Sequence, residues 1–355
     1  MKPQKTILLF ILFSLLPLPF VLGIFADVDG SIGAIWDAIS FFIVYVAAIL
    51  LYLVTFNNTR KCSKKFFIYK LIWLQEMFIL SGILGTFLGF VFIFQGMELD
   101  GVLGVDPSAA VISNFAIAII TLLYGVLGAS IVYLVQKYYE MNNDGTDSVE
   151  VIKPKEGYLF SSMLYFLVFV VLDVLAAFLG SENTGGLSVM VQGESLLYIL
   201  TVTIVLILFY KGDSFINLIK NTFWYIPNTQ KHIEYNLNYI RNMKKITAMF
   251  IIISLLCAPI VMLVAICCLP PEINNLGWNN TPFIGLKNGS IIFFWILFII
   301  IILTIIEGRE VSKLYFETGK ISAGDRFYSL KYILSPAFLL FFTVSIGIML
   351  SFVAL

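Results

Sequence analysis

Long apolar runs recur along the whole chain and constrain its fold more than any other feature. Each run holds about 20 residues, which as an α-helix spans about 30 Å of hydrocarbon. Of the 355 residues, 60% are hydrophobic and 12% are charged, a balance that a single soluble core cannot accommodate. We therefore predict an all-α polytopic membrane protein, with the lipid bilayer as its main partner. About nine transmembrane helices are expected, at residues 6–25, 31–56, 67–95, 109–136, 158–180, 195–211, 246–270, 289–306 and 332–355.

The joins between these runs alternate in charge. Every second join is rich in Lys and Arg, whereas the others carry mainly Asp and Glu and have Lys287 as their only base. Basic joins stay on the inner side of a membrane, so the pattern predicts an N-terminus inside and a C-terminus outside. The basic set includes Arg60, Lys137, Lys244 and Arg309.

Three segments outside the runs bear on the organisation. The run at 6–25 has a basic start and small residues near its end, so it is either a cleaved signal peptide or the first span. Cleavage would leave eight spans. The start of the longest inner segment, 212–245, fits either a helix lying among the lipid headgroups or a solvated linker. The polar segment 141–157 reads as a linker between two regions, 1–140 and 158–355.

Several function classes are disfavoured by the composition. The formal net charge is zero, which makes nucleic acid an unsuitable partner. The four cysteines have no metal-binding spacing and His232 is the only histidine, so neither a metal site nor a cofactor is expected. No nucleophile, base and acid can be picked out together, which argues against an enzyme.

The third and fourth spans differ from the others because small residues line one face of each. Gly82, Thr86 and Gly89 share a face of the third span, and Gly85 lies beside them. Ala118, Thr121, Gly125 and Gly128 share a face of the fourth. Small residues allow helix backbones to approach closely in a membrane.

The two threonines are expected at the same depth. Each lies ten or eleven residues from the loop between the spans, about 15 Å at 1.5 Å per residue. Two hydroxyls at one depth suit either of two roles. They bind water or a carboxyl group, or they are ordinary helix-packing residues.

Two carboxylic residues fall within the apolar runs. Asp173 is close to the middle of the fifth run, where an ionisable group is a candidate for function. It is either a proton carrier or a structural residue that stays protonated or is hydrogen-bonded to a neighbouring Ser or Thr. Glu76 lies about ten residues into the third span, which places it at the inner interface.

The hairpin of the third and fourth spans resembles the MotA/TolQ/ExbB proton-channel family. The matching stretches run from Gly82 to Gly89, through Asp106 and Pro107, and from Ala116 to Ala129. The first two spans are similar to the MotA branch, through the stretch Gly30 to Ser40. The resemblance covers about residues 6–137.

This resemblance implies a multi-pass protein of the bacterial inner membrane that forms a homo-oligomeric ring around a single-span partner. A membrane carboxylate on that partner takes up protons, and proton flow drives motion. Thr86 and Thr121 would line the proton path, with Asp173 as a further candidate. The close-packing positions would be Gly82, Gly85, Gly89, Gly125 and Gly128.

The sequence also departs from this family. The join between the second and third spans is only about ten residues, Asn57 to Phe66, where flagellar members carry a large domain. Residues 158–355 add five spans. They are either a degenerate repeat, since Gly185 to Ser195 resembles Gly30 to Ser40, or unrelated spans that share N-capping residues, because the fifth to eighth spans lack a clear Gly-Thr-Gly motif. A secondary transporter and a non-catalytic membrane scaffold are the alternatives.

Overall fold

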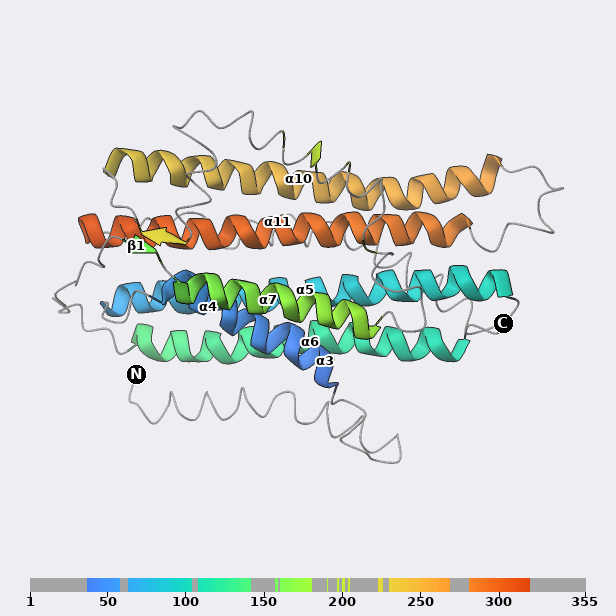
Figure 1. The fold of residues 1–355 in the computed structure, drawn as a ribbon, viewed down its shortest axis with the longest axis horizontal. Coiled ribbons are helices and arrows are strands. Elements are labelled where there is room, and N and C mark those ends of the chain that lie inside the picture. Colours follow the sequence, from blue (N-terminus) through green and yellow to red (C-terminus); the bar gives the residue numbers. More distant parts are fainter. Residues whose placement is uncertain are drawn as a thin grey trace.

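The structure is a computed structural model and is almost entirely helical (Figure 1). It describes residues 37–57, 63–103, 108–141, 157–158, 160–180, 223–225, 230–268 and 281–319, with isolated positions at 190, 197, 200, 201 and 204. The predicted spans at 6–25 and 332–355 lie outside the described residues, as does most of 195–211. The Gly30 to Ser40 and Gly185 to Ser195 stretches and the 141–157 linker also fall largely outside them.

Six stretches of described helix coincide with predicted spans. The first is a continuous run of α3 (Ala38–Phe41), η2 (Phe42–Val46) and α4 (Ala47–Phe56). The others are α5 (Lys64–Leu103), α6 (Ser108–Met141), α7 (Phe160–Gly180), α10 (Gln230–Cys268) and α11 (Thr281–Thr318). Among the described residues, the first stretch, α5, α6 and α11 are long and apolar enough to cross a membrane, and the apolar part of α7, Phe160–Leu175, is shorter. The prediction of an all-α protein is therefore confirmed, and the four candidate spans are compatible with a multi-pass membrane protein.

The long helices extend well beyond their apolar runs. α5 has 40 residues, α10 (Gln230–Cys268) has 39 and α11 has 38, so each is about 60 Å long, roughly twice the hydrocarbon thickness. Figure 1 shows α10, α11 and α5 running side by side. Residues 230–245, the second half of the predicted inner segment, form the first turns of α10, and this helix packs on α11. The start of that segment, where a headgroup helix or a linker is predicted, lies largely outside the described residues.

Side chains and one glycine mark the helix ends. Asp37 accepts a hydrogen bond from the Ser40 amide at 2.6 Å, which caps α3. Ser63 caps α5 by accepting from the Phe66 amide at 3.3 Å. Gly319 ends α11 with a positive φ of 66°, the left-handed conformation that glycine adopts without a Cβ penalty. Besides the helices, the described residues include two short strands, β1 (Gly157–Tyr158) and β2 (Trp224–Tyr225), which pair antiparallel.

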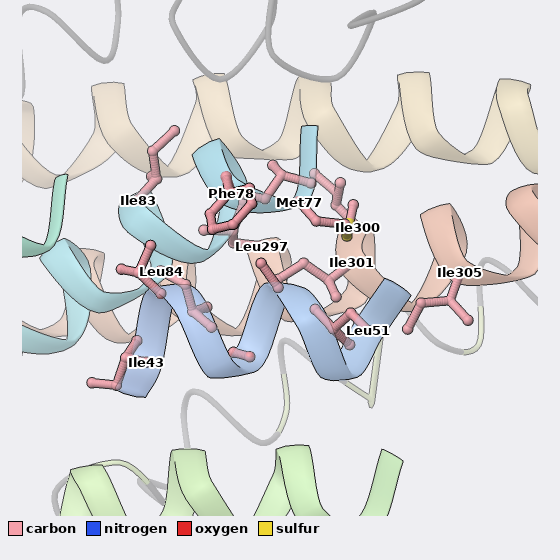
Figure 2. Close-up of a cluster of buried hydrophobic side chains, with 14 of the residues drawn as sticks. Ile43, Leu51, Met77, Phe78, Ile83, Leu84, Leu297, Ile300, Ile301 and Ile305 are labelled. Carbon is pink, nitrogen blue, oxygen red and sulfur yellow. The ribbon is translucent and has the colours of Figure 1, made fainter. Parts of the chain in front are cut away.

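One hydrophobic core joins the two predicted regions. Figure 2 shows side chains of η2, α4, α5 and α11 meeting in a single cluster. Phe87 of α5 stacks on Phe293 of α11 with ring centroids 3.8 Å apart, and the Trp73 indole donates to the Thr304 carbonyl at 3.2 Å. α11 thus packs directly on α5, although nearly 200 residues of sequence separate them.

The helix α7 lies along α4 and η2. The Asn57 amide bonds the Ser161 hydroxyl at one end of this contact. Beside it, the Arg309 guanidinium of α11 bridges the Val54 carbonyl and the Ser162 hydroxyl. The negative end of the α4 dipole is a favourable place for this cation.

Candidate functional site

The small-residue faces of α5 and α6 meet each other in a regular antiparallel register. Gly82 lies against Gly125, Thr86 against Thr121, and Gly89 against Ala118. Each step along α5 is matched by an equal step back along α6, so the helices remain close for about two turns. The sequence pattern therefore corresponds to a real interface between these two helices.

Very little space remains for side chains at the glycines. A Cβ on Gly82 would lie 3.0 Å from the Gly125 Cα, and a Cβ on Gly125 would lie 2.8 Å from the Phe78 carbonyl oxygen. A Cβ on Gly89 would meet the Ala118 Cβ at 2.7 Å. Real Cβ atoms essentially never make contacts under 3.0 Å, so Gly89 and Gly125 require glycine for the observed approach, and the contact at Gly82 is tighter than most real ones.

The other two predicted close-packing glycines, Gly85 and Gly128, lie against side chains and not against the backbone of the partner helix. A Cβ on Gly85 would meet the Ile43 side chain of η2 at 3.0 Å and the Thr121 Cβ at 3.2 Å. A Cβ on Gly128 would run into the Phe78 ring. Gly85 is therefore the position where η2, α5 and α6 come together.

Thr86 and Thr121 lie in contact at the centre of this interface, as their predicted equal depth requires. Their Oγ1 atoms are 3.2 Å apart, and both side chains are buried. Thr86 Oγ1 is 2.8 Å from the Gly82 carbonyl and 3.0 Å from the Ala118 carbonyl. Thr121 Oγ1 is 2.6 Å from the same Ala118 carbonyl.

The pair has more acceptors than protons. Two hydroxyls carry two protons, whereas the Gly82 carbonyl, the Ala118 carbonyl and the hydroxyl oxygens all accept. Whichever carbonyls the protons satisfy, lone pairs on Thr86 and Thr121 remain open to a further donor. The geometry suits both a packed interhelical hydrogen bond and the acceptance of a proton donor.

Asp173 is placed apart from the threonine pair. It lies on α7, across α4 and η2 from the α5–α6 interface. Its Oδ2 atom is buried and has no hydrogen-bond partner among the described residues. No hydrogen bond joins Asp173 to Thr86 or Thr121 in the part of the chain that the structure describes. The three candidate proton-path residues therefore form a pair and a separate carboxyl group.

A cluster of buried and half-buried charges lies about ten residues along α5 from the threonine pair, and we call it the charged end. Its members are Glu76 of α5, Arg241 and Lys244 of α10, and Glu307 of α11. Lys244 Nζ lies 2.9 Å from Glu307 Oε2 and 3.5 Å from Glu76 Oε1. Arg241 Nε lies 2.9 Å from Glu307 Oε1. These pairs hold α10 on α5 and α11.

Polar side chains continue at this depth on α6. The Gln75 amide donates to Gln136 Oε1 at 2.5 Å, and the Gln136 amide donates to Glu140 Oε1 at 2.5 Å. Sequence reasoning placed Glu76 at an interface but missed its partners on α10 and α11. The available signal was the spacing of Arg241 and Lys244 by one helical turn, matched by Glu307 on an apolar helix.

No protein-family model, curated protein or solved structure matches the chain. The resemblance to the MotA/TolQ/ExbB family therefore remains a prediction that rests on the residues of the α5–α6 hairpin.

Proposed function

We propose that the protein is a proton-channel-like membrane subunit that couples proton flow to motion or work in a single-span partner. The observation that carries this proposal is the contact of Thr86 with Thr121 inside a glycine-lined helix pair. A hydroxyl pair in an apolar interface supplies oxygen lone pairs where the surrounding side chains supply none. Those lone pairs are what a protonated carboxyl group or a hydronium ion requires.

The proposed setting is the bacterial inner membrane, crossed by nine helices with the N-terminus inside and the C-terminus outside. In this orientation the charged end faces the inside. Glu76 and Thr86 are ten residues apart on α5, about 15 Å at 1.5 Å per residue. The threonine pair then lies near mid-membrane, and the charged end marks the inner boundary.

The proposed assembly is a homo-oligomer that surrounds a single-span protein bearing a membrane carboxylate. Asp173 is the carboxyl group within this chain that could take or relay the same proton, since an ionisable residue in a membrane helix is costly to retain without a role. The proposal needs neither a metal nor an organic cofactor, and it assigns no enzymatic step.

Substitution of the two threonines tests the proposal. Thr→Val at position 86 or 121 keeps the side-chain shape and deletes the hydroxyl, whereas Thr→Ser keeps the hydroxyl and deletes a methyl group. A proton path needs the hydroxyl, so Val should lower proton uptake into proteoliposomes far more than Ser. Packing alone gives the opposite order, because Ser leaves a small gap that costs about 1 kcal/mol.

Thr304 of α11 is the matched control. It is equally buried, and its hydroxyl donates to the Ile300 carbonyl at 2.8 Å, but it lies outside the α5–α6 interface. Thr304→Val should leave proton uptake unchanged. Full proton uptake by the variant with Val at both positions 86 and 121 would contradict the proposed function. The α5–α6 hairpin would then be a helix-packing motif only.

A further inference from the structure

Arg309 of α11 is a buried cation to which the described residues offer no counter-charge. Its side chain is 5% exposed, and its hydrogen bonds go to a carbonyl and a hydroxyl, with no carboxylate among them. By contrast, Lys244 pairs with Glu307 at 2.9 Å, and Lys313 pairs with Glu310 at 2.7 Å. A buried charge without a partner of opposite sign is costly, so Arg309 needs a physical reason of its own.

The hydrogen bonds of the Arg309 guanidinium are also incomplete. Its Nη2 atom carries two protons and bonds the Val54 carbonyl and the Ser162 hydroxyl. Its Nε atom is buried and has no hydrogen-bond partner among the described residues. It is the only atom of a cationic side chain among the buried atoms that lack a partner there. Buried donors are almost always hydrogen-bonded, so an acceptor is missing from this place.

Two serine hydroxyls beside the guanidinium also lack an acceptor. Ser162 accepts from Arg309, and Ser161 accepts from the side-chain amide of Asn57. Each hydroxyl carries a proton as well, and neither proton is donated to another group within the described helices. The two O–H groups and the Nε–H group are therefore three donors without an acceptor. Ser162 is fully buried and Ser161 is half-buried, so the site opens at Ser161.

The helix ends at this site leave its positive charge in place. Both serines lie in the first turn of α7, where backbone amides have no partner within the helix and the dipole is positive. The last turn of α4, which ends at Phe56, supplies the negative end of a dipole through the Val54 carbonyl. Each dipole end is worth about half a charge, so the two offset each other beside Arg309. Donors around an uncompensated cation fit an anion.

The outer face of α7 indicates which anion fits. Phe160, Leu164, Leu167 and Val171 are all exposed, with exposed fractions from 47% to 68%. Their spacing of three or four residues places them on one side of the helix. This apolar stripe is about 16 Å long at 1.5 Å per residue and begins in the same turn as the two serines. A phosphate at the serines with a hydrocarbon chain along the stripe matches both features.

The sequence next to the two helix ends is basic. Arg60 and Lys61 follow α4, and Lys153 and Lys155 precede α7. Clusters of Lys and Arg beside a membrane helix attract anionic lipids. This charge favours a lipid with a net negative headgroup over a zwitterionic lipid.

We infer that Arg309, Ser161 and Ser162 bind the phosphate group of an anionic phospholipid whose acyl chain lies on the apolar stripe of α7. The phosphate oxygens accept from Arg309 Nε and from both hydroxyls, and their charge compensates the guanidinium. In the proposed topology this lipid belongs to the inner leaflet. The site is separate from the threonine pair and takes no part in the proposed proton path. Inorganic phosphate shares the headgroup chemistry but has no chain for the stripe.

Native mass spectrometry of the delipidated protein in detergent tests the inference. Phosphatidylglycerol is titrated in, and phosphatidylcholine with the same acyl chains is titrated in parallel. Phosphatidylglycerol should bind more tightly, and added inorganic phosphate should not displace it. Equal binding of the two lipids would overturn the anionic specificity. Displacement by inorganic phosphate would overturn the lipid as the occupant.

Substitutions show whether the binding occurs at this site. Ser161→Ala removes one O–H donor, which should raise the Kd of phosphatidylglycerol about tenfold, the usual worth of a hydrogen bond to a charged group. Arg309→Gln should raise the Kd by at least as much. Ser130→Ala is the control, because the Ser130 hydroxyl of α6 donates to the Val126 carbonyl of its own helix at 2.8 Å. An unchanged Kd in Arg309→Gln would contradict the inference.

Thermal unfolding separates lipid binding from a purely structural role of Arg309. Without anionic lipid, Arg309→Gln removes an uncompensated buried charge, so its unfolding midpoint should equal or exceed that of the unsubstituted protein. With phosphatidylglycerol, the unsubstituted protein should gain stability and the variant should not. A structural arginine predicts a lower midpoint for Arg309→Gln in both conditions, and that result would overturn the inference. Neither measurement involves proton flux, so both are independent of the proposed function.

Discussion

At the scale of single residues, the contact between α5 and α6 depends on atoms that glycine lacks. Gly82 and Gly125 lie against each other's backbones, and the threonine hydroxyls meet only because these backbones are so close. The spacing of small residues allowed this face to be predicted. The partners of the hydroxyls could not be predicted, because the carbonyls of Gly82 and Ala118 carry no signal in a sequence.

Gly125→Ala should destabilise the protein markedly. The added Cβ would lie 2.8 Å from the Phe78 carbonyl, and a backbone atom cannot move aside as a flexible side chain can. Overpacking of this kind costs about 1–3 kcal/mol. The check is thermal unfolding in detergent, with Val126→Ala as the control, since Val126 is 49% exposed on the other side of α6. Equal midpoints for the two variants would show that the helices separate at little cost.

At the scale of elements, the charged end fixes α10 on its neighbours. Apolar runs predicted where the membrane helices lie, but not how far they continue, because polar residues extend a helix whenever a neighbouring helix satisfies them. Arg241 and Lys244 have that role in α10. The π-helical turn η2 was also unpredictable, since no glycine or proline marks Phe42–Val46.

Lys244→Met should loosen α10 more than any substitution of an exposed lysine. Lys244 is 7% exposed and pairs with both Glu76 and Glu307, so its removal takes this cation from Glu76 and leaves Glu307 paired with Arg241. Breaking a buried pair from one side costs about 3–5 kcal/mol. The rate of proteolytic cleavage near the start of α10 measures how far the helix has loosened.

Lys137→Met provides the comparison for that experiment. Lys137 pairs with Glu140 at 2.7 Å but is 45% exposed, and such surface pairs contribute at most about 1 kcal/mol. If Lys244→Met and Lys137→Met leave α10 equally resistant to proteolysis, the charged end is not what holds the helix in place.

At the scale of the whole molecule, the described helices on both sides of the predicted 141–157 linker share one hydrophobic core. α11 packs on α5, and α7 packs on α4, so contacts cross the predicted boundary repeatedly. Hydropathy shows which segments enter a membrane but not which of them are neighbours. Only the α5–α6 pairing carried its own signal, because matched small residues occur on two consecutive runs.

The orientation of these helices is open to a direct test. The charge pattern places Cys62 inside and the far end of α5, near Asp100, outside. A cysteine introduced at Asp100 or at Asn280 should react with a membrane-impermeant thiol reagent in intact cells, whereas Cys62 should react only after permeabilisation. Labelling of Cys62 in intact cells would reverse the proposed topology.

The register of α5 against α6 also limits how the gene for this protein can change over generations. Each residue inserted or deleted turns the remainder of a helix by about 100° and would bring a larger side chain opposite every glycine beyond that point. Substitutions can accumulate on the outer faces of these helices. Between positions 78 and 89, and between 118 and 128, a change in length would have to be compensated on the partner helix. Descendant sequences should therefore preserve these two intervals residue for residue, even where they vary in composition.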